Sequence, residues 1–229
     1  MGSLARYGTA ASKIVRLAAF RRRGVAIDDL VDAARVVPVA RLPGAEYGAP
    51  LAKALLEGGL PIVELTWDPV ASVSIVHAIR RVVPGMTIGV GVVSEPEDVE
   101  ALSDAGISYV VGSTLACARA ARACGLPFIA AVSDDEQVQG FAREGHRHCR
   151  ILPSGDAAAG GGAMRTAHPG VHFQDYSDEP AQCAVRVTEA GRAGTACSWI
   201  APRDLIAAGR FGEIARRARV ARDIAHTTA

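Results

Sequence analysis

Pro61-Ile-Val-Glu-Leu-Thr-Trp67 is a short apolar run of strand character with one carboxylate, Glu64, in its middle. Alternate side chains of a strand share a face, so Glu64 and Thr66 are expected on the same side. A carboxylate in a buried strand is costly unless it is hydrogen-bonded, paired or neutral. We therefore interpret Glu64 as a site residue, and the alternative is a satisfied structural carboxylate at the end of a strand.

Similar runs recur along the chain from Val36 onward. They alternate with amphipathic stretches, which is typical of repeated βα units around a parallel sheet. We find eight such runs, at Val36–Arg41, Pro61–Trp67, Thr87–Val93, Ser108–Ser113, Pro127–Ser133, His148–Ser154, Val171–Tyr176 and Gly194–Trp199. Eight strands joined by helical connections of this length predict an α/β fold, the (β/α)₈ TIM barrel.

The expected helices lie between these runs. They are Tyr47–Leu56, Val70–Val82, Pro96–Asp104, Thr114–Ala123, Asp134–Arg143 and Glu179–Ala190, with Phe211–Ile224 closing the chain. The weakest unit follows Pro153, where residues 154–163 are so rich in glycine that we expect a mobile loop before any helix.

Residues 1–34 are rich in Ala and Arg and are expected to form a helical extension packed outside the barrel. A basic amphipathic stretch can also bind membranes or nucleic acid, but packing against its own domain is the commoner outcome. Residues 35–229 then form one barrel domain, because 229 residues with 49% hydrophobic content suit a single core of this kind.

The charge and the cysteine content indicate which classes of partner and which cellular compartment to expect. The formal net charge is +1 with both signs spread along the chain, which predicts neither a nucleic-acid nor a membrane partner. No apolar segment reaches the length of a membrane span, so we expect a cytoplasmic protein. The five cysteines form no close metal-type pair, which favours reduced thiols without a disulfide framework or a zinc site.

Lysine is almost absent from this chain. Lys13 and Lys53 are the only lysines among the 25 basic residues, and the others are arginines. Any lysine-dependent chemistry must therefore use one of these two side chains.

Four motifs resemble the small class I aldolases that cleave 2-keto-3-deoxy-6-phosphogluconate (KDPG). They are Val37-Pro-Val-Ala-Arg41, residues 52–66 ending in Ile-Val-Glu-Leu-Thr66, Gly89-Val-Gly-Val-Val93 and Ser198-Trp-Ile-Ala-Pro202. The resemblance implies a trimeric barrel in which Glu64 is a general acid or base. It also implies that Arg41 helps to hold an anionic substrate.

The nucleophile of that family is missing. The family forms a Schiff base through a lysine on the sixth strand, three residues before a proline, and here the stretch is His148-Cys-Arg-Ile-Leu-Pro153. Arg150 occupies the lysine position, and a guanidinium that stays protonated cannot act as an amine nucleophile. Lys13 in the extension and Lys53 on the first barrel helix are poor substitutes.

Other positions of the family's site motifs are also substituted in this chain. The arginine that the family places shortly after the second-strand carboxylate is Asp68, and the threonine of its third-strand motif is Val92. The Gly-Gly turn that helps cradle phosphate falls in a stretch that reads Gln174-Asp-Tyr-Ser-Asp178. These changes argue against a phosphorylated substrate.

The first functional hypothesis is a lyase-like enzyme without an imine, cofactor or metal, which acts on a small carbonyl or carboxylate compound. Glu64 would move a proton while Arg150 holds an oxyanion or carboxylate, as decarboxylation, hydration or dehydration, or cyclisation would each require. The expected catalytic residues are Glu64, Arg150, Asp175 and Tyr176, and the expected substrate-binding residues are Arg41, Thr66, Gln174 and Ser198.

Two alternatives stay open. One is a catalytically inactive barrel that serves as a ligand-binding or scaffold protein. A tight ion pair in the empty protein between Glu64 and Arg150, which we expect close together inside the barrel mouth, would favour this alternative. A metal-dependent lyase would need carboxylates such as Glu64, Asp68 and Asp175 on one cation, which Arg150 would repel.

Overall fold

The computed structural model describes residues 35–152, 157–183 and 194–227. The expected extension over residues 1–34 lies outside them, and so does most of the helix expected over Glu179–Ala190. Both stay predictions.

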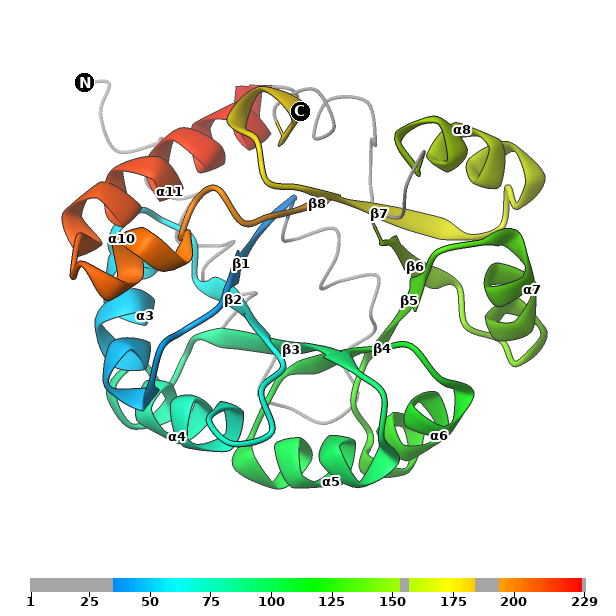
Figure 1. Ribbon diagram of the computed structural model, residues 1–229, viewed down its shortest axis with the longest axis horizontal. Coiled ribbons are helices and arrows are strands. Elements are labelled where there is room, and N and C mark those ends of the chain that lie inside the picture. Colours follow the sequence, from blue (N-terminus) through cyan, green and yellow to red (C-terminus); the bar gives the residue numbers. More distant parts are fainter. Residues whose placement is uncertain (1–34, 153–156, 184–193, 228–229) are drawn as a thin grey trace, which may run out of the picture.

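Eight parallel strands close into a barrel in chain order, with the helices outside it (Figure 1). The strands are β1 (Val36–Ala40), β2 (Ile62–Thr66), β3 (Thr87–Val93), β4 (Tyr109–Gly112), β5 (Phe128–Val132), β6 (His148–Ile151), β7 (His172–Ser177) and β8 (Thr195–Cys197). Seven of them lie within the runs that the sequence predicts, and β7 extends one residue beyond its predicted run, to Ser177. The (β/α)₈ barrel is therefore confirmed.

The helices that surround the barrel are η2 (Ala45–Tyr47), α3 (Gly48–Glu57), α4 (Ser72–Val82), α5 (Pro96–Ala105), α6 (Leu115–Cys124), α7 (Asp135–Arg143), α8 (Ala157–Ala167), α10 (Arg203–Ala207) and α11 (Phe211–Thr227). Six of them, α3 to α7 and α11, begin and end close to their predicted bounds, and the sequence predicts no bounds for the other three. Side chains of Thr114 and Asp134 accept backbone N–H bonds at the starts of α6 and α7. Gly106 and Gly125 end α5 and α6 with positive φ, where a side chain would be strained.

Helix α8 occupies much of the glycine-rich stretch in which we expect a mobile loop before any helix. It begins at Ala157 and runs through three glycines, although glycine disfavours a helix interior. Its later turns are held by tertiary contacts: Met164 packs on the core, and the Arg165 guanidinium lies 5.8 Å from the centre of the Phe173 ring on β7. Packing of one face thus outweighs weak local propensity.

The strands separate two apolar layers. Outward-facing side chains pack under the helices in the larger cluster, whereas a small cluster fills the barrel interior. Its members are Val37, Ile62, Tyr109, Val111, Ile129 and Ala131. The interior is consequently a packed core rather than a pore.

One prediction from cysteine usage was wrong. Cys183, in the helical residues 180–183 after β7, and Cys197, at the end of β8, form a disulfide with Cα atoms 6.5 Å apart, while Cys117, Cys124 and Cys149 are free thiols. The two residues are 14 positions apart in the chain and meet only because β7 and β8 are neighbours. Within the described residues, no helix has the length and apolar character needed to cross a membrane.

Candidate active site

Glu64 and Arg150 meet inside the barrel from β2 and β6, four strands apart around it. Arg150 Nη2 donates to Glu64 Oε2 at 2.7 Å, and Arg150 Nη1 donates to the other carboxylate oxygen. Each residue is only 2% exposed. The expectation that these two side chains lie close together is confirmed, and they form a bidentate ion pair shielded from solvent.

Gln174 holds the other edge of the guanidinium. Its Oε1 accepts a bond of 2.9 Å from Arg150 Nε and a second bond from Nη2. The parallel register of β6 and β7 places Arg150 beside Gln174, which is 3% exposed. Gln174, expected to bind substrate, here binds Arg150.

Tyr109 completes the network and is the residue that sequence reasoning missed. Its hydroxyl donates to Glu64 Oε2 at 3.0 Å, and the residue is fully buried. The ring lies against Gly89 of β3, where a Cβ atom would overlap it. The register pairs Gly89 with Tyr109, so a glycine opposite an aromatic residue on the neighbouring strand was the available signal.

Burial and charge set the protonation of these groups. Burial raises the pKa of Tyr109 well above its usual value, and the Glu64 carboxylate raises it further. Burial lowers the pKa of Arg150, but the facing Glu64 carboxylate outweighs this effect and the pKa is raised. The phenol therefore stays protonated and the guanidinium charged, so neither group gives up a proton readily near neutral pH.

Asp175 lies on the other face of β7 from Gln174. Its carboxylate accepts a bond of 2.7 Å from Arg165 of α8, in the layer between the barrel and the helices. The structure thus separates Asp175 from the Glu64–Arg150 pair. A catalytic role for Asp175 stays an untested prediction.

The remaining expected site residues lie nearer the strand ends. Thr66 and Tyr176 are half-buried on the same strand faces as Glu64 and Gln174, and Ser198 is half-buried just after β8. Arg41 is exposed after β1. The structure brings Glu64, Arg150 and Gln174 into contact with one another.

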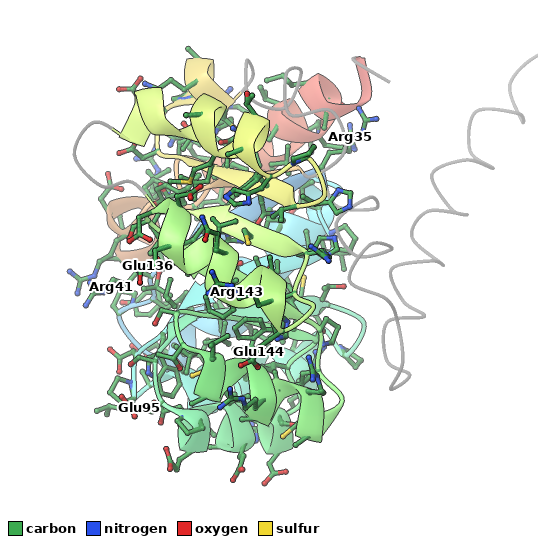
Figure 2. The ribbon with its side chains drawn as sticks, turned by 90° about the vertical axis from the view of Figure 1, so that its right-hand side faces the viewer. Arg35, Arg41, Glu95, Glu136, Arg143 and Glu144 are labelled. Atoms are coloured by element: carbon green, nitrogen blue, oxygen red, sulfur yellow. A yellow bond between two sulfur atoms is a disulfide. The ribbon has the colours of Figure 1, made fainter. Side chains whose placement is uncertain are left out.

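The rim where the strands end carries acidic groups. Figure 2 shows Glu95 and Glu136 at the same end of the barrel as Arg41, and Arg35 at the opposite end. Asp68 at this rim accepts the backbone N–H groups of Val70 and Ala71, which accounts for it as a turn residue. In the described part of the chain, no three His, Cys, Asp or Glu side chains gather to hold a metal ion.

The family model for the aldolases described as "KDPG and KHG aldolase" matches residues 27–177, a stretch that includes Glu64, Tyr109, Arg150 and Gln174. The chain belongs to this family.

Individual relatives agree with the family match. The chain is 26% identical over 205 residues to 2-dehydro-3-deoxy-phosphogluconate aldolase of Pseudoalteromonas atlantica, covering 86% of this chain and 94% of that relative. It is 27% identical over 207 residues to the enzyme of the same name from Dickeya dadantii, covering 85% and 93%. It is also 27% identical over 199 residues to KHG/KDPG aldolase of Escherichia coli, covering 81% and 90%.

Solved structures support the fold. KDPG aldolase from Legionella pneumophila, crystallised with pyruvate captured as a covalent carbinolamine intermediate, matches with a TM-score of 0.76 and 24% identity over 85% of this chain and 97% of that one. KDPG aldolase of Zymomonas mobilis with 3-phosphoglycerate matches with a TM-score of 0.75 and 22% identity over 85% and 94%. At this level of identity the likeness extends to the fold alone.

Proposed function

We propose that this chain is a KDPG-aldolase-like protein that does not use Schiff-base chemistry and whose barrel serves as a ligand-binding or scaffold core. The observation that carries the proposal is the tight ion pair of Glu64 and Arg150. In it the carboxylate that would move protons and the cation that would hold a substrate neutralise each other. Such a pair in the empty protein favours the non-catalytic alternative.

The absence of an imine-forming amine follows from the side chains themselves. Arg150 stands at the position that resembles the family's lysine, and its guanidinium is fully charged and hydrogen-bonded. Lys53 is exposed on α3, outside the barrel. The chain's other lysine, Lys13, lies outside the described residues.

The second candidate function is a lyase-like enzyme that works by acid/base catalysis on a small carbonyl or carboxylate compound, by decarboxylation, hydration or dehydration, or cyclisation. Its supporting observation is that Glu64 is also bonded to Tyr109, so the carboxylate keeps a partner if the ion pair opens. An opened Glu64 would be a carboxylate inside the barrel that no longer pairs with a cation, which is the position a general base needs.

Under either function, we expect a ligand that carries no phosphate group. Asp178 follows β7 where the family's glycine turn is expected, and Glu95 and Glu136 lie at the same end of the barrel as Arg41 (Figure 2). Negative groups around the rim oppose the entry of a phosphorylated ligand.

A cytoplasmic homotrimer without cofactor, metal, nucleic-acid partner or membrane partner completes the proposal. Disulfides are rare in the reducing cytoplasm, so the bond between Cys183 and Cys197 is unusual for this location. Both residues are buried, which shields the bond from reductants.

Borohydride trapping with pyruvate tests the missing imine. We expect no covalent adduct by mass spectrometry and no cleavage of KDPG above background. The Arg150→Lys variant is the matched comparison. It should also fail to cleave KDPG, because Asp68, Val92 and Asp178 have replaced other groups of the family's site. An adduct on Lys13 or Lys53 of the wild type, or appreciable cleavage by it, would overturn the proposal.

Glu64→Gln separates the two candidate functions once a turnover reaction is found among small oxo acids and hydroxy acids. Loss of a general base lowers the rate by roughly 10²–10⁴-fold. Such a loss would favour the enzyme. Equal rates would remove Glu64 from the mechanism and leave Tyr176 and Asp175 as the candidates.

A further inference from the structure

A groove of about 600 Å³ lies between the C-terminal helices and the segments that follow β7 and β8. Its walls include residues of α10 and α11, which Figure 1 shows side by side. A volume of this size is in the range that small-molecule sites occupy. Its lining contains neither Glu64 nor Arg150, so the groove is separate from the candidate active site.

The apolar part of the groove is formed by prolines, aliphatic side chains and one indole ring. Pro180, Pro202, Val220 and Ile224 line it together with Trp199. Trp199 is only 7% exposed, yet its indole N–H has no hydrogen-bond partner in the described part of the chain. A buried donor without a partner is rare in folded proteins and calls for an unseen partner such as solvent or a ligand.

The two arginines of the groove are already neutralised. Arg216 and Arg217 of α11 both bind the carboxylate of Glu213, through their Nε atoms at 2.7 Å and 2.9 Å. Hydrogen bonds from these two arginines lower the pKa of Glu213 to about 2, so this carboxylate stays ionised at neutral pH. An anionic ligand would therefore have to compete with Glu213 for the two guanidinium groups.

The two carboxylates of the groove are not neutralised in this way. Asp178 follows β7 and Asp204 lies in the first turn of α10, and both are exposed. Within the residues that the structure describes, neither carboxylate takes part in a hydrogen bond or an ion pair. A cation placed between them breaks no existing pair and is attracted by both charges.

A disulfide fixes the two walls of the groove relative to each other. The wall that follows β7 precedes Cys183, the wall that follows β8 begins after Cys197, and these two cysteines are bonded. Walls that are already held in place reduce the entropy that a ligand loses on binding, because fewer groups have to be ordered.

We propose that this groove binds an organic ammonium ion with an apolar body. The ammonium group lies between Asp178 and Asp204, and the apolar body packs against Trp199, whose ring also attracts a cation. The inference goes beyond the proposed function and does not depend on it, since the residues of the barrel interior take no part in this site.

Fluorescence of Trp199 tests the proposal on the full-length protein. The chain has two tryptophans, so Trp67→Phe leaves Trp199 as the only one. Titration with phenethylamine near neutral pH should change the Trp199 emission with saturation, at a dissociation constant of about 1 mM or below. Phenethyl alcohol and phenylpropanoate are similar in size but carry no positive charge, and they should bind at least about tenfold more weakly.

Variants in the same Trp67→Phe background assign the ammonium site. Asp178→Asn/Asp204→Asn removes both charges with little change in shape and should weaken the binding of phenethylamine about tenfold. The matched control Glu97→Gln/Glu100→Gln removes two exposed carboxylates of α5, on the other side of the barrel from α11, and should leave the affinity unchanged (Figure 1). Calorimetry of the same proteins measures the affinity independently of emission.

Four results would overturn the proposal. They are the absence of saturable phenethylamine binding, binding by calorimetry that leaves the Trp199 emission unchanged, equal affinities for phenethylamine and phenylpropanoate, and an unchanged affinity in Asp178→Asn/Asp204→Asn.

Discussion

Glu64 and Arg150 are ionised side chains in a place where an unpaired charge is very costly. Each is 2% exposed, and the pair is stabilised by hydrogen bonds from Tyr109 and to Gln174. A buried pair of this kind contributes little net stability compared with apolar residues. Removal of one partner, however, leaves the other as an unpaired buried charge. The network therefore specifies the arrangement of the interior more than it stabilises the fold.

Removal of Arg150 alone should lower the stability of the fold much more than removal of both Arg150 and Glu64. We expect Arg150→Met to lower the free energy of unfolding by about 3–5 kcal/mol, because Glu64 stays buried without its cation. Glu64→Gln/Arg150→Met should recover most of that loss. Denaturant unfolding measures both values, with Arg143→Met as a near-neutral control. A double variant as unstable as the single one would contradict this account.

Tyr109 should be the last tyrosine to ionise. Because the folded pKa is raised above the unfolded value, its contribution to stability is complete below about pH 10 and is lost as the pH rises further. Tyrosinate absorbance should show a late alkaline step that disappears in Tyr109→Phe and remains in Tyr47→Phe. A late step that survives in Tyr109→Phe would exclude this assignment.

At the scale of elements, β3 and β4 fit together through a glycine and an aromatic ring. Gly89 leaves the space that the Tyr109 ring fills, and this fit lets the hydroxyl reach Glu64. The same pairing of strands places Gly91 against Val111. Glycines in β3 are therefore packing residues for the neighbouring strand.

Gly89→Ala tests this fit. The added methyl group overlaps the Tyr109 ring, so we expect a loss of about 1–3 kcal/mol or more in the free energy of unfolding. Combining it with Tyr109→Leu, which removes the ring, should cost less than the sum of the two single changes. Thermal unfolding of the four proteins gives the coupling. Additive losses would mean that Gly89 and Tyr109 do not share this contact.

The disulfide joins the helical residues 180–183, which follow β7, to the end of β8. It closes a loop between Cys183 and Cys197, which are 14 positions apart, and chain-entropy estimates for a loop of this size are about 3 kcal/mol. Cys183→Ser should lower the free energy of unfolding by about this amount under non-reducing conditions. Cys124→Ser, at a free thiol, should change little. If dithiothreitol and Cys183→Ser both leave unfolding unchanged, the bond does not form in solution.

The whole molecule is expected to assemble as a homotrimer, as the resemblance to the aldolase family implies. Sedimentation equilibrium should then give a mass three times that of the 23.8 kDa chain. The measurement should be repeated with Arg150→Met, since an interior change should not alter assembly. A monomeric mass for the wild type would end this prediction.

Which positions form strands could be predicted from the sequence because β-branched runs, turns and helical periodicity are local patterns. Seven of the eight strands lie within the runs predicted from these patterns, and β7 extends one residue beyond its run. Alternation within a strand also predicts that Gln174 and Asp175 face opposite ways, so only one of them could enter the interior. Gln174 is the one that enters the interior, and the catalytic role expected of Asp175 stays an untested prediction.

The sequence by itself determined the barrel, the missing amine at Arg150 and the expectation that Glu64 and Arg150 meet. Tertiary structure alone decided that the pair is closed by Gln174 and Tyr109, that Cys183 binds Cys197 and that glycine-rich α8 is a helix. The physical reason is that local patterns fix the face on which a side chain lies. Contacts between strands depend on register, on barrel closure and on packing, which join residues far apart in the chain.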